Sequence, residues 1–165
     1  MKANREDDPV LRLIYVAVFN LAQYKSTDNR LSKPFNPILG ETFELKNKEY
    51  KYFAEQVSHH PPITACYAYG RQNDYKYWMN TVMKTKFWGK SLEVQAVGLS
   101  HTKLIGRNEM YSVQRPSTIV NILGKLSLEH HGVLTCQREN SDFEVGQELG
   151  QEDDQDISTV YSPTQ

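Results

Sequence analysis

Residues 55–62 read Glu55-Gln56-Val57-Ser58-His59-His60-Pro61-Pro62, and this stretch is the most distinctive in the chain. The residues before Ser58 continue a strand-like segment. The two prolines end it, because proline has no backbone N–H to donate to a sheet ladder. Two adjacent histidines are thereby held at the end of a strand.

Four interpretations of the pair His59 and His60 remain open from these residues alone. A zinc site would need two further ligands, and no ligand spacing is recognisable. A histidine general base would need a nucleophile motif, which does not accompany it. Two imidazoles beside a lysine could instead bind a phosphate monoester, as cations or as neutral N–H donors. The fourth interpretation is a purely structural pair.

A second unusual segment precedes the first and reads Lys33-Pro34-Phe35-Asn36-Pro37-Ile38-Leu39-Gly40-Glu41. Two prolines and a glycine within nine residues predict a rigid, non-repetitive loop. Such a loop could aim the Lys33 ammonium, the Asn36 amide and backbone N–H groups at one point. It could equally be a connector that only turns the chain.

On the N-terminal side of this loop the sequence predicts one helix, at about residues 9–25. Asp8 is a favourable N-cap, and Pro9 suits the first helical position. Neither glycine nor proline interrupts residues 10–24. Apolar residues occur almost all round this helix, so we expect it to be buried on more than one side.

On the C-terminal side the apolar pattern changes to a period of two, which predicts short antiparallel strands of a sandwich or barrel. The expected strands, about seven to nine, are residues 42–46, 50–57, 63–69, 75–82, 92–96, 102–105, 109–113, 118–122 and 125–129. The fold class is therefore mainly β with an N-terminal helix. The strand at 125–129 is expected to be an unpaired edge.

Charge is distributed unevenly along the chain. Residues 139–165 carry eight acidic residues and no Lys or Arg, whereas residues 1–138 carry 19 basic and 12 acidic residues, a net charge of +7. We therefore expect a folded domain over residues 1–138 and an acidic, disordered segment over residues 139–165. A basic body suggests an anionic partner such as nucleic acid, a membrane surface or a phosphorylated ligand, or simply lysines that keep strands soluble.

Composition narrows the function classes further. The longest strongly apolar run, residues 13–22, is too short to span a bilayer, and no apolar stretch precedes Pro9 as a signal peptide would require. Cys66 and Cys136 are too few for a disulfide scaffold or a four-cysteine zinc site. The expectation is a reduced, cytoplasmic protein with no metal, no cofactor and no catalytic activity.

The two motifs at 33–41 and 55–62 together resemble the lipid-binding domain of the oxysterol-binding-protein-related family. Residues 55–62 match the family fingerprint at every position. The resemblance continues through Phe87-Trp88-Gly89-Lys90-Ser91-Leu92-Glu93 and through residues 111–132, so that it covers about residues 8–132.

This resemblance implies an incomplete antiparallel barrel around a lipid-sized tunnel. It implies binding of sterol or phosphatidylinositol 4-phosphate, in some members phosphatidylserine, and exchange of these lipids between membranes. At the matching positions Lys33, Asn36, His59 and His60 would hold the inositol phosphates. The implied location is cytoplasmic and peripheral to intracellular membranes, in contact with anionic membranes and without nucleic acid.

Family domains are considerably longer than this chain. The N-terminal lid and the later strands and helices have no counterpart here, so the sequence is interpreted as a truncated fragment whose lipid transfer is compromised. The alternative is a non-transporting interaction or regulatory fragment that keeps only part of the phosphoinositide-binding surface.

Overall fold

The computed structural model describes residues 1–27, 32, 35–124, 126–149 and 160–161. A 3-10 turn, η1 (Lys2–Arg5), precedes helix α1 (Pro9–Leu21), which continues as a second 3-10 segment, η2 (Ala22–Thr27). The strands that follow are β1 (Thr42–Lys46), β2 (Tyr50–Ser58), β3 (Ile63–Gly70), β4 (Tyr75–Phe87), β5 (Ser91–Val97), β6 (Ser100–Leu104), β7 (Glu109–Gln114), β8 (Ser117–Asn121), β9 (Ser127–Arg138), β10 (Glu144–Leu149) and β11 (Val160–Tyr161).

The predicted helix is confirmed, including its start. The Asp8 carboxylate accepts hydrogen bonds from the backbone N–H groups of Val10 and Leu11, and Pro9 occupies the first turn. Burial differs from the expectation, because only one side is covered: Leu13 and Val16 are buried, whereas Val18 is 51% exposed. The single sheet supplies one packing surface, so a helix lying on it can bury one face only.

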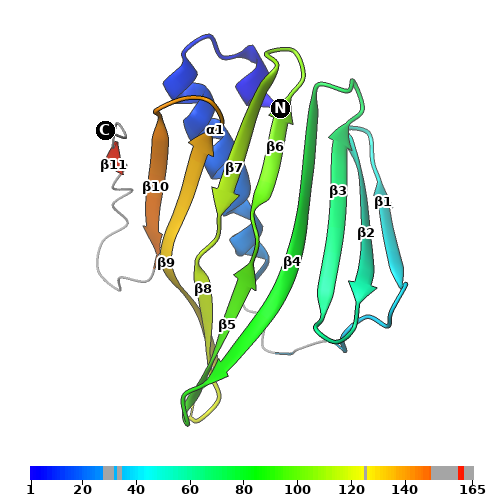
Figure 1. Ribbon diagram of the computed structural model, residues 1–165, viewed down its shortest axis with the longest axis vertical. Helices are drawn as coiled ribbons and strands as arrows, with labels where there is room; N and C mark the ends of the chain where they lie inside the picture. The colour runs from blue at the N-terminus through cyan, green and yellow to red at the C-terminus, as the bar shows by residue number, and fades with distance from the viewer. Residues whose placement is uncertain (28–31, 33–34, 125, 150–159, 162–165) are drawn as a thin grey trace.

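All the strands belong to one antiparallel sheet, as the period-two pattern predicts (Figure 1). The chain runs as a meander in which two long strands are each divided into two shorter ones. The first is divided into β5 and β6, which both pair with β4. The second is divided into β7 and β8, which both pair with β9. Within the described residues β1 and β11 form the two edges, so the sheet is a partial ring.

The first interruption, between β5 and β6, requires a glycine. Gly98 has φ +115°, and a Cβ at this position would lie 2.5 Å from the carbonyl oxygen of Asn80 on β4. The second interruption, between β7 and β8, contains Pro116, which cannot donate to a ladder. Such breaks let a long strand bend without losing its neighbours, which a strongly curved sheet needs.

Several strand boundaries differ from the prediction. Strand β4 extends to Phe87 rather than ending at residue 82, and β9 extends to Arg138. The expectation that the strand at 125–129 is an unpaired edge is wrong. The strand found there is β9, which pairs with β7, β8 and β10. The sequence underestimates the length of β4 because lysines on its exposed half conceal the alternation there.

The expectation that the chain beyond residue 139 takes no part in the sheet is wrong for residues 160–161, which form β11 beside β10, and for residues 144–149. These form β10, which pairs with β9 along its length, and Val145 is buried in the core opposite Cys136. The acidic composition concealed a period of two, because Glu144 and Glu148 lie on the face opposite to Val145. The same expectation for residues 150–159 and 162–165 lies outside the described residues.

Helix α1 lies on the concave, inner face of the sheet, behind β6, β7, β9 and β10 (Figure 1). The core there joins Leu13 and Val16 of the helix to Tyr111, Leu134 and Val145 of the strands. None of the described helices lies behind β1, β2 and β3 in this view. The inner face of these strands is therefore the less covered half of the sheet.

An ion pair fastens the helix to the sheet. Arg12, which is 6% exposed, donates to both carboxylate oxygens of Glu109 at 2.8 and 2.6 Å. Tyr111 and Arg138 donate to the same carboxylate. Burial raises the pKa of Glu109, but hydrogen bonds from Arg12 and Tyr111 outweigh it and leave this pKa below its ordinary value.

We expect Arg12→Leu to lower the free energy of unfolding by about 3 kcal/mol, because it leaves a carboxylate without its main partner in a mostly buried site. Urea denaturation followed by circular dichroism measures this. Arg107→Leu is the matched control: it breaks an exposed ion pair with Asp7 and should cost much less. Equal losses in the two variants would contradict the anchoring role.

The lowered pKa of Glu109 also predicts a pH dependence of stability. The stabilisation is present above the ordinary carboxyl pKa of about 4.3 and is lost as the pH falls through the lower folded-state value. Glu109→Gln should therefore narrow the difference in unfolding free energy between neutral pH and strongly acidic pH. A variant with the full acid dependence of the parent protein would show that other carboxyl groups cause it.

Candidate functional site

The structure brings the two sequence motifs together at one end of the sheet. The N–H of Gly40 donates to the carbonyl oxygen of Gln56 at 2.9 Å. The N–H of Gln56 in turn donates to the carbonyl oxygen of Glu41 at 3.0 Å. From there β1 pairs with β2, beginning with Thr42 opposite Glu55. The end of the first motif, at Gly40 and Glu41, is thus joined to β2, the strand that the histidine pair follows.

Gln56 fixes the conformation of the chain just before the histidines. It is 2% exposed, and its side-chain amide donates to the Ser58 carbonyl at 2.9 Å. The hydroxyl of Thr64 on β3 donates to the Gln56 side-chain oxygen at 2.6 Å. Because the pairing of β2 with β3 shifts between Gln56 and Ser58, this amide supports a bulge.

Two of the four predicted site residues lie side by side. His59 and His60 are exposed, and their ring centroids are 4.3 Å apart. Asn36 is exposed on the adjoining loop, and Lys33 lies outside the described residues. The geometry therefore brings His59 beside His60 and joins the loop that carries Asn36 to their strand.

A cavity of about 840 Å³ lies on the inner face, between the N-terminal helical segments and strands β2 to β4. Its wall includes Phe19, Tyr52, Ala68, Tyr77 and Met79. Pockets that enclose small organic ligands have volumes of about 300–1,000 Å³ and mostly apolar walls. The volume of this cavity lies in that range, and its wall combines apolar side chains with charged ones.

The cavity wall contains a small neutral hydrogen-bonding group. The side-chain amide of Gln23 donates to the Tyr77 hydroxyl at 3.1 Å, and this hydroxyl is 3.2 Å from the sulfur of Met79. Burial raises the pKa of Tyr77 and also that of Tyr52. Both phenols are neutral at neutral pH, and the hydroxyl of Tyr77, which is 4% exposed, is bonded to the Gln23 side chain.

The rim of the cavity is charged, with Lys2, Arg5, Lys48, Arg71, Glu49 and Asp74 among its lining residues. This charged rim lies at the end of the sheet that carries the β1–β2 and β3–β4 turns. His59 and His60 lie at the opposite end, in the β2–β3 turn (Figure 1). Sequence reasoning missed these residues. Strand alternation places Tyr52, Ala68 and Tyr77 on one face, but the sequence does not indicate where the helix leaves that face open.

Small side chains connect the two ends along the inner face. Thr64 pairs with Gln56 near the histidines, Cys66 then pairs with Ala54, and Ala68 pairs with Tyr52 at the cavity. Residues i and i+2 of a strand share a face, so Thr64, Cys66 and Ala68 form one row. Cys66 and Ala68 are buried and pack with Tyr77 in one apolar cluster.

Arg115 is a further inner-face cation that sequence reasoning missed. It donates to the Thr81 hydroxyl at 3.0 Å and to the Gly98 carbonyl at 3.4 Å. Its Nε is buried and has no hydrogen-bond partner in the described part of the chain. It lines a smaller cavity of about 370 Å³ at the interruptions of the sheet.

Residues 1–27, 32, 35–124, 126–149 and 160–161 contain no group of three or more His, Cys, Asp or Glu side chains placed to hold a metal ion. Burial raises the pKa of the Cys66 thiol, and it raises that of Cys136 to about 12. Thiolates are the reactive form of cysteine, so neither residue is an activated nucleophile at neutral pH.

Comparison with known proteins relates this arrangement to one family. Residues 1–151 match the family described as Oxysterol-binding protein. Over 146 residues the chain is 42% identical to the mouse oxysterol-binding protein-related protein 3, a match that covers 86% of this chain and 17% of the relative. It is 42% identical over 134 residues to the oxysterol-binding protein homolog 2 of Saccharomyces cerevisiae, covering 76% of this chain and 10% of that protein.

Solved structures agree with the sequence relatives. The Osh1 ORD domain in complex with cholesterol superposes with a TM-score of 0.80 at 32% identity, covering 90% of this chain and 37% of that one. The Osh3 ORD of Saccharomyces cerevisiae in complex with PI(4)P superposes with a TM-score of 0.75 at 30% identity. This match covers 88% of this chain and 39% of the Osh3 chain. The chain thus spans well under half the length of these relatives. The match over residues 1–151 extends past the boundary at about 132 inferred from the motifs.

Gly40 makes the junction between the two motifs possible, because its φ is 79°. In this region a Cβ meets the following carbonyl oxygen, so we expect Gly40→Ala to lower the free energy of unfolding by about 1–2 kcal/mol. Hydrogen exchange at the Gln56 amide should also rise. Gly106→Ala is the control, since a Cβ there meets no atom within 4 Å and no positive φ is required. Similar losses in both variants, measured by urea denaturation, would contradict the role given to Gly40.

Proposed function

The chain belongs to the oxysterol-binding protein family, and on this premise we propose that it forms a lipid-binding part of such a domain, holding a sterol or phosphatidylinositol 4-phosphate. The family consists of lipid-transfer proteins rather than enzymes. The observation that carries the proposal is the cavity of about 840 Å³, in which apolar side chains such as Phe19, Ala68 and Met79 lie together with a charged rim.

The chemistry of the cavity suits a sterol. A sterol is an apolar body with one hydroxyl group, so it needs an apolar wall and one or two neutral hydrogen-bond partners. Phe19, Ala68 and Met79 supply apolar wall, and the pair Gln23 and Tyr77 supplies both a donor and an acceptor. The relative solved with cholesterol supports this choice of ligand.

The other end of the sheet suits an inositol phosphate. A phosphate that leaves water needs several donors, and charge-assisted donors are the strongest. His59 and His60 are exposed side by side, and Asn36 lies on the loop joined to their strand. With Lys33, these residues form the proposed head-group site. The relative solved with PI(4)P supports this assignment.

The same features indicate what kind of contact the protein makes with membranes. None of the described helices is long and apolar enough to cross a bilayer. We propose peripheral, cytoplasmic contact with anionic membranes, without a role in nucleic-acid binding. Phosphatidylserine is a further lipid that the head-group donors could accept.

The two ends can be tested with crossed variants. His59→Ala/His60→Ala should weaken binding of phosphatidylinositol 4-phosphate by about 1.5–3 kcal/mol for each hydrogen bond to phosphate that is removed, and should change sterol binding little, because sterol carries no phosphate. Ala68→Leu should weaken sterol binding, because it fills part of the cavity. Extraction of each labelled lipid from liposomes by the purified chain measures both.

Ala65→Leu is the control for the cavity variant, because Ala65 lies on the same strand but alternates to the opposite face. Circular dichroism must show that every variant is folded. Equal loss of both lipids in the folded histidine variant would refute the head-group assignment. A parent chain that binds neither lipid but still adsorbs to anionic vesicles would favour the alternative function, a non-transporting interaction fragment.

A further inference from the structure

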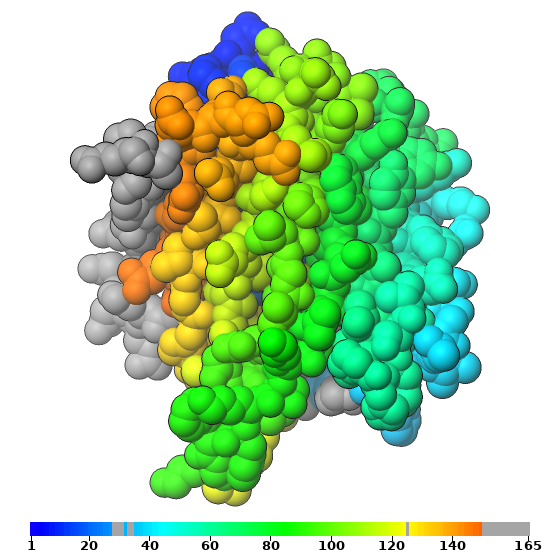
Figure 2. Space-filling view, viewed as in Figure 1, coloured from blue at the N-terminus to red at the C-terminus, as the bar shows by residue number. Residues whose placement is uncertain are grey.

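Two turns project together beyond the body of the molecule. The β4–β5 hairpin turns at residues 88–90, and residues 122–124 and 126 belong to the turn between β8 and β9. The N–H of Ile122 donates to the carbonyl oxygen of Lys90 at 3.1 Å, and Ser91 pairs with Asn121. Figure 2 shows the two turns as one convex protrusion, which we name the tip.

The tip carries several exposed large apolar side chains. Phe87 is 62% exposed, Trp88 is 57% exposed and Leu123 is 63% exposed. Ile122 and Leu126 on the same turn are also exposed. Contiguous exposed apolar side chains on a protein surface mark interaction sites, whereas single ones do not.

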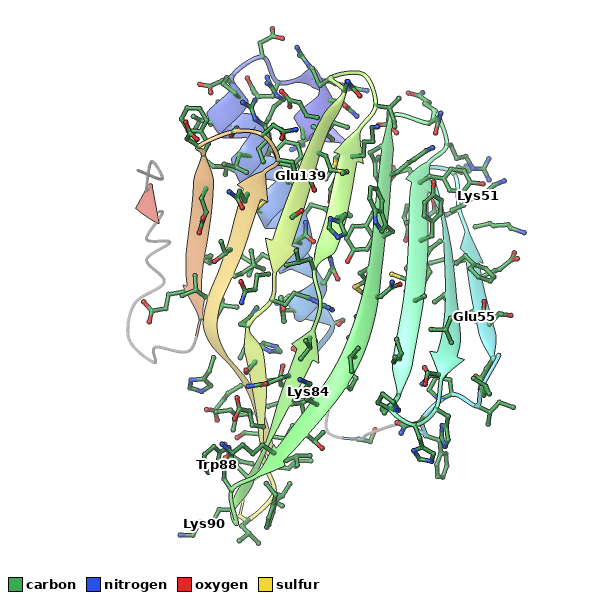
Figure 3. The ribbon with its side chains drawn as sticks, in the orientation of Figure 1. Lys51, Glu55, Lys84, Trp88, Lys90 and Glu139 are labelled. Atoms are coloured by element: carbon green, nitrogen blue, oxygen red, sulfur yellow. The ribbon has the colours of Figure 1, made fainter. Side chains whose placement is uncertain are left out.

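Basic side chains surround these apolar residues. Lys84, Lys86 and Lys90 are exposed on the hairpin, and Figure 3 shows Lys90 extending away from the body. The Lys86 ammonium lies 3.9 Å from the centre of the Trp88 ring. Glu93, which accepts a hydrogen bond from the Trp88 indole, is the only acidic residue among residues 84–93. The hairpin therefore has a net positive charge.

We propose that the tip is a membrane-docking element that places Phe87, Trp88 and Leu123 in the head-group region of an anionic lipid bilayer, with Lys86 and Lys90 against lipid phosphates. Charge complementarity favours this partner over a neutral surface. The tip is convex and thus offers no groove to a peptide, whereas a bilayer deforms around a convex wedge. Indole and lysine side chains both suit the boundary between water and hydrocarbon.

The proposal concerns a surface that the lipid-holding cavity does not include. The tip lies at the same end of the sheet as the β2–β3 turn, which carries His59 and His60 (Figure 1). The carbonyl of Pro62 in that turn accepts a hydrogen bond from Met83 of β4, near the base of the hairpin. A docked tip would therefore turn the histidine end toward the membrane.

Tryptophan fluorescence tests the depth of the tip directly, because Trp78 and Trp88 are the only two tryptophans in the sequence. Trp78→Phe leaves Trp88 as the single reporter, and Trp88→Phe leaves Trp78, which stacks on His101 on the outer face. With vesicles of phosphatidylcholine and phosphatidylserine, we expect a blue shift from Trp88 and none from Trp78. Neutral phosphatidylcholine vesicles should produce little shift.

Charge reversal tests the lysines. Lys86→Glu/Lys90→Glu should reduce sedimentation with the anionic vesicles at least about tenfold. Lys51→Glu/Lys76→Glu makes the same change in net charge at the opposite end of the sheet, on the face away from the cavity, and should change binding less than about twofold. Both variants must keep the circular dichroism of the parent chain.

Three results would overturn the proposal: no Trp88 shift although the chain binds the vesicles, equal losses in the two lysine variants, or a blue shift without vesicles that accompanies dimerisation. The last would show that a second copy covers the tip. Ala68→Leu, which tests the cavity, should leave the vesicle-induced shift unchanged. Failure of the tip and failure of the proposed lipid site are thus distinguishable.

Discussion

The bidentate ion pair between Arg12 and Glu109 sets where the helix lies, and the remaining architecture depends on that position. Glu109 lies at the start of β7, and the same carboxylate accepts hydrogen bonds from Tyr111 and from Arg138 of β9. Helix α1 is therefore held over β6, β7, β9 and β10. This helix has 13 residues. At the rise of an α-helix it is only about 20 Å long, so it cannot also cover β1, β2 and β3.

This incomplete cover produces the cavity. Where the helix packs, Leu13 and Val16 fill the inner face, and Asn20 reaches β6 through a hydrogen bond from Ser100 at 2.9 Å. Beyond the helix, Phe43 and Leu45 of β1 are exposed, and the space between Phe19 and β2 to β4 is open. An apolar wall that the chain leaves bare is a binding surface for an apolar ligand, because its burial by that ligand is favourable.

Polar and apolar functions are separated along the sheet. The cavity wall on the inner face carries neutral phenols such as Tyr52 and Tyr77, and Arg115 lies on the same face beside Thr81. Charged and hydrogen-bonding groups gather at the two ends, and the tip adds exposed apolar residues to one of them. A lipid has the same division between head group and tail, and the arrangement follows from strand alternation combined with a single helix on one face.

The sequence by itself determined the helix, the antiparallel meander, the histidine pair and the family. Local rules suffice for these: Asp8 and Pro9 mark a helix start, period-two alternation marks strands, and residues 55–62 match a fingerprint. Only the tertiary structure decided that Val145 brings an acid-rich segment into the core and that Gly40 joins the two motifs. It also decided that the cavity opens at the end opposite the histidines. These features depend on which distant residues meet, and Arg12 and Glu109, 97 positions apart, carry no local signal of their contact.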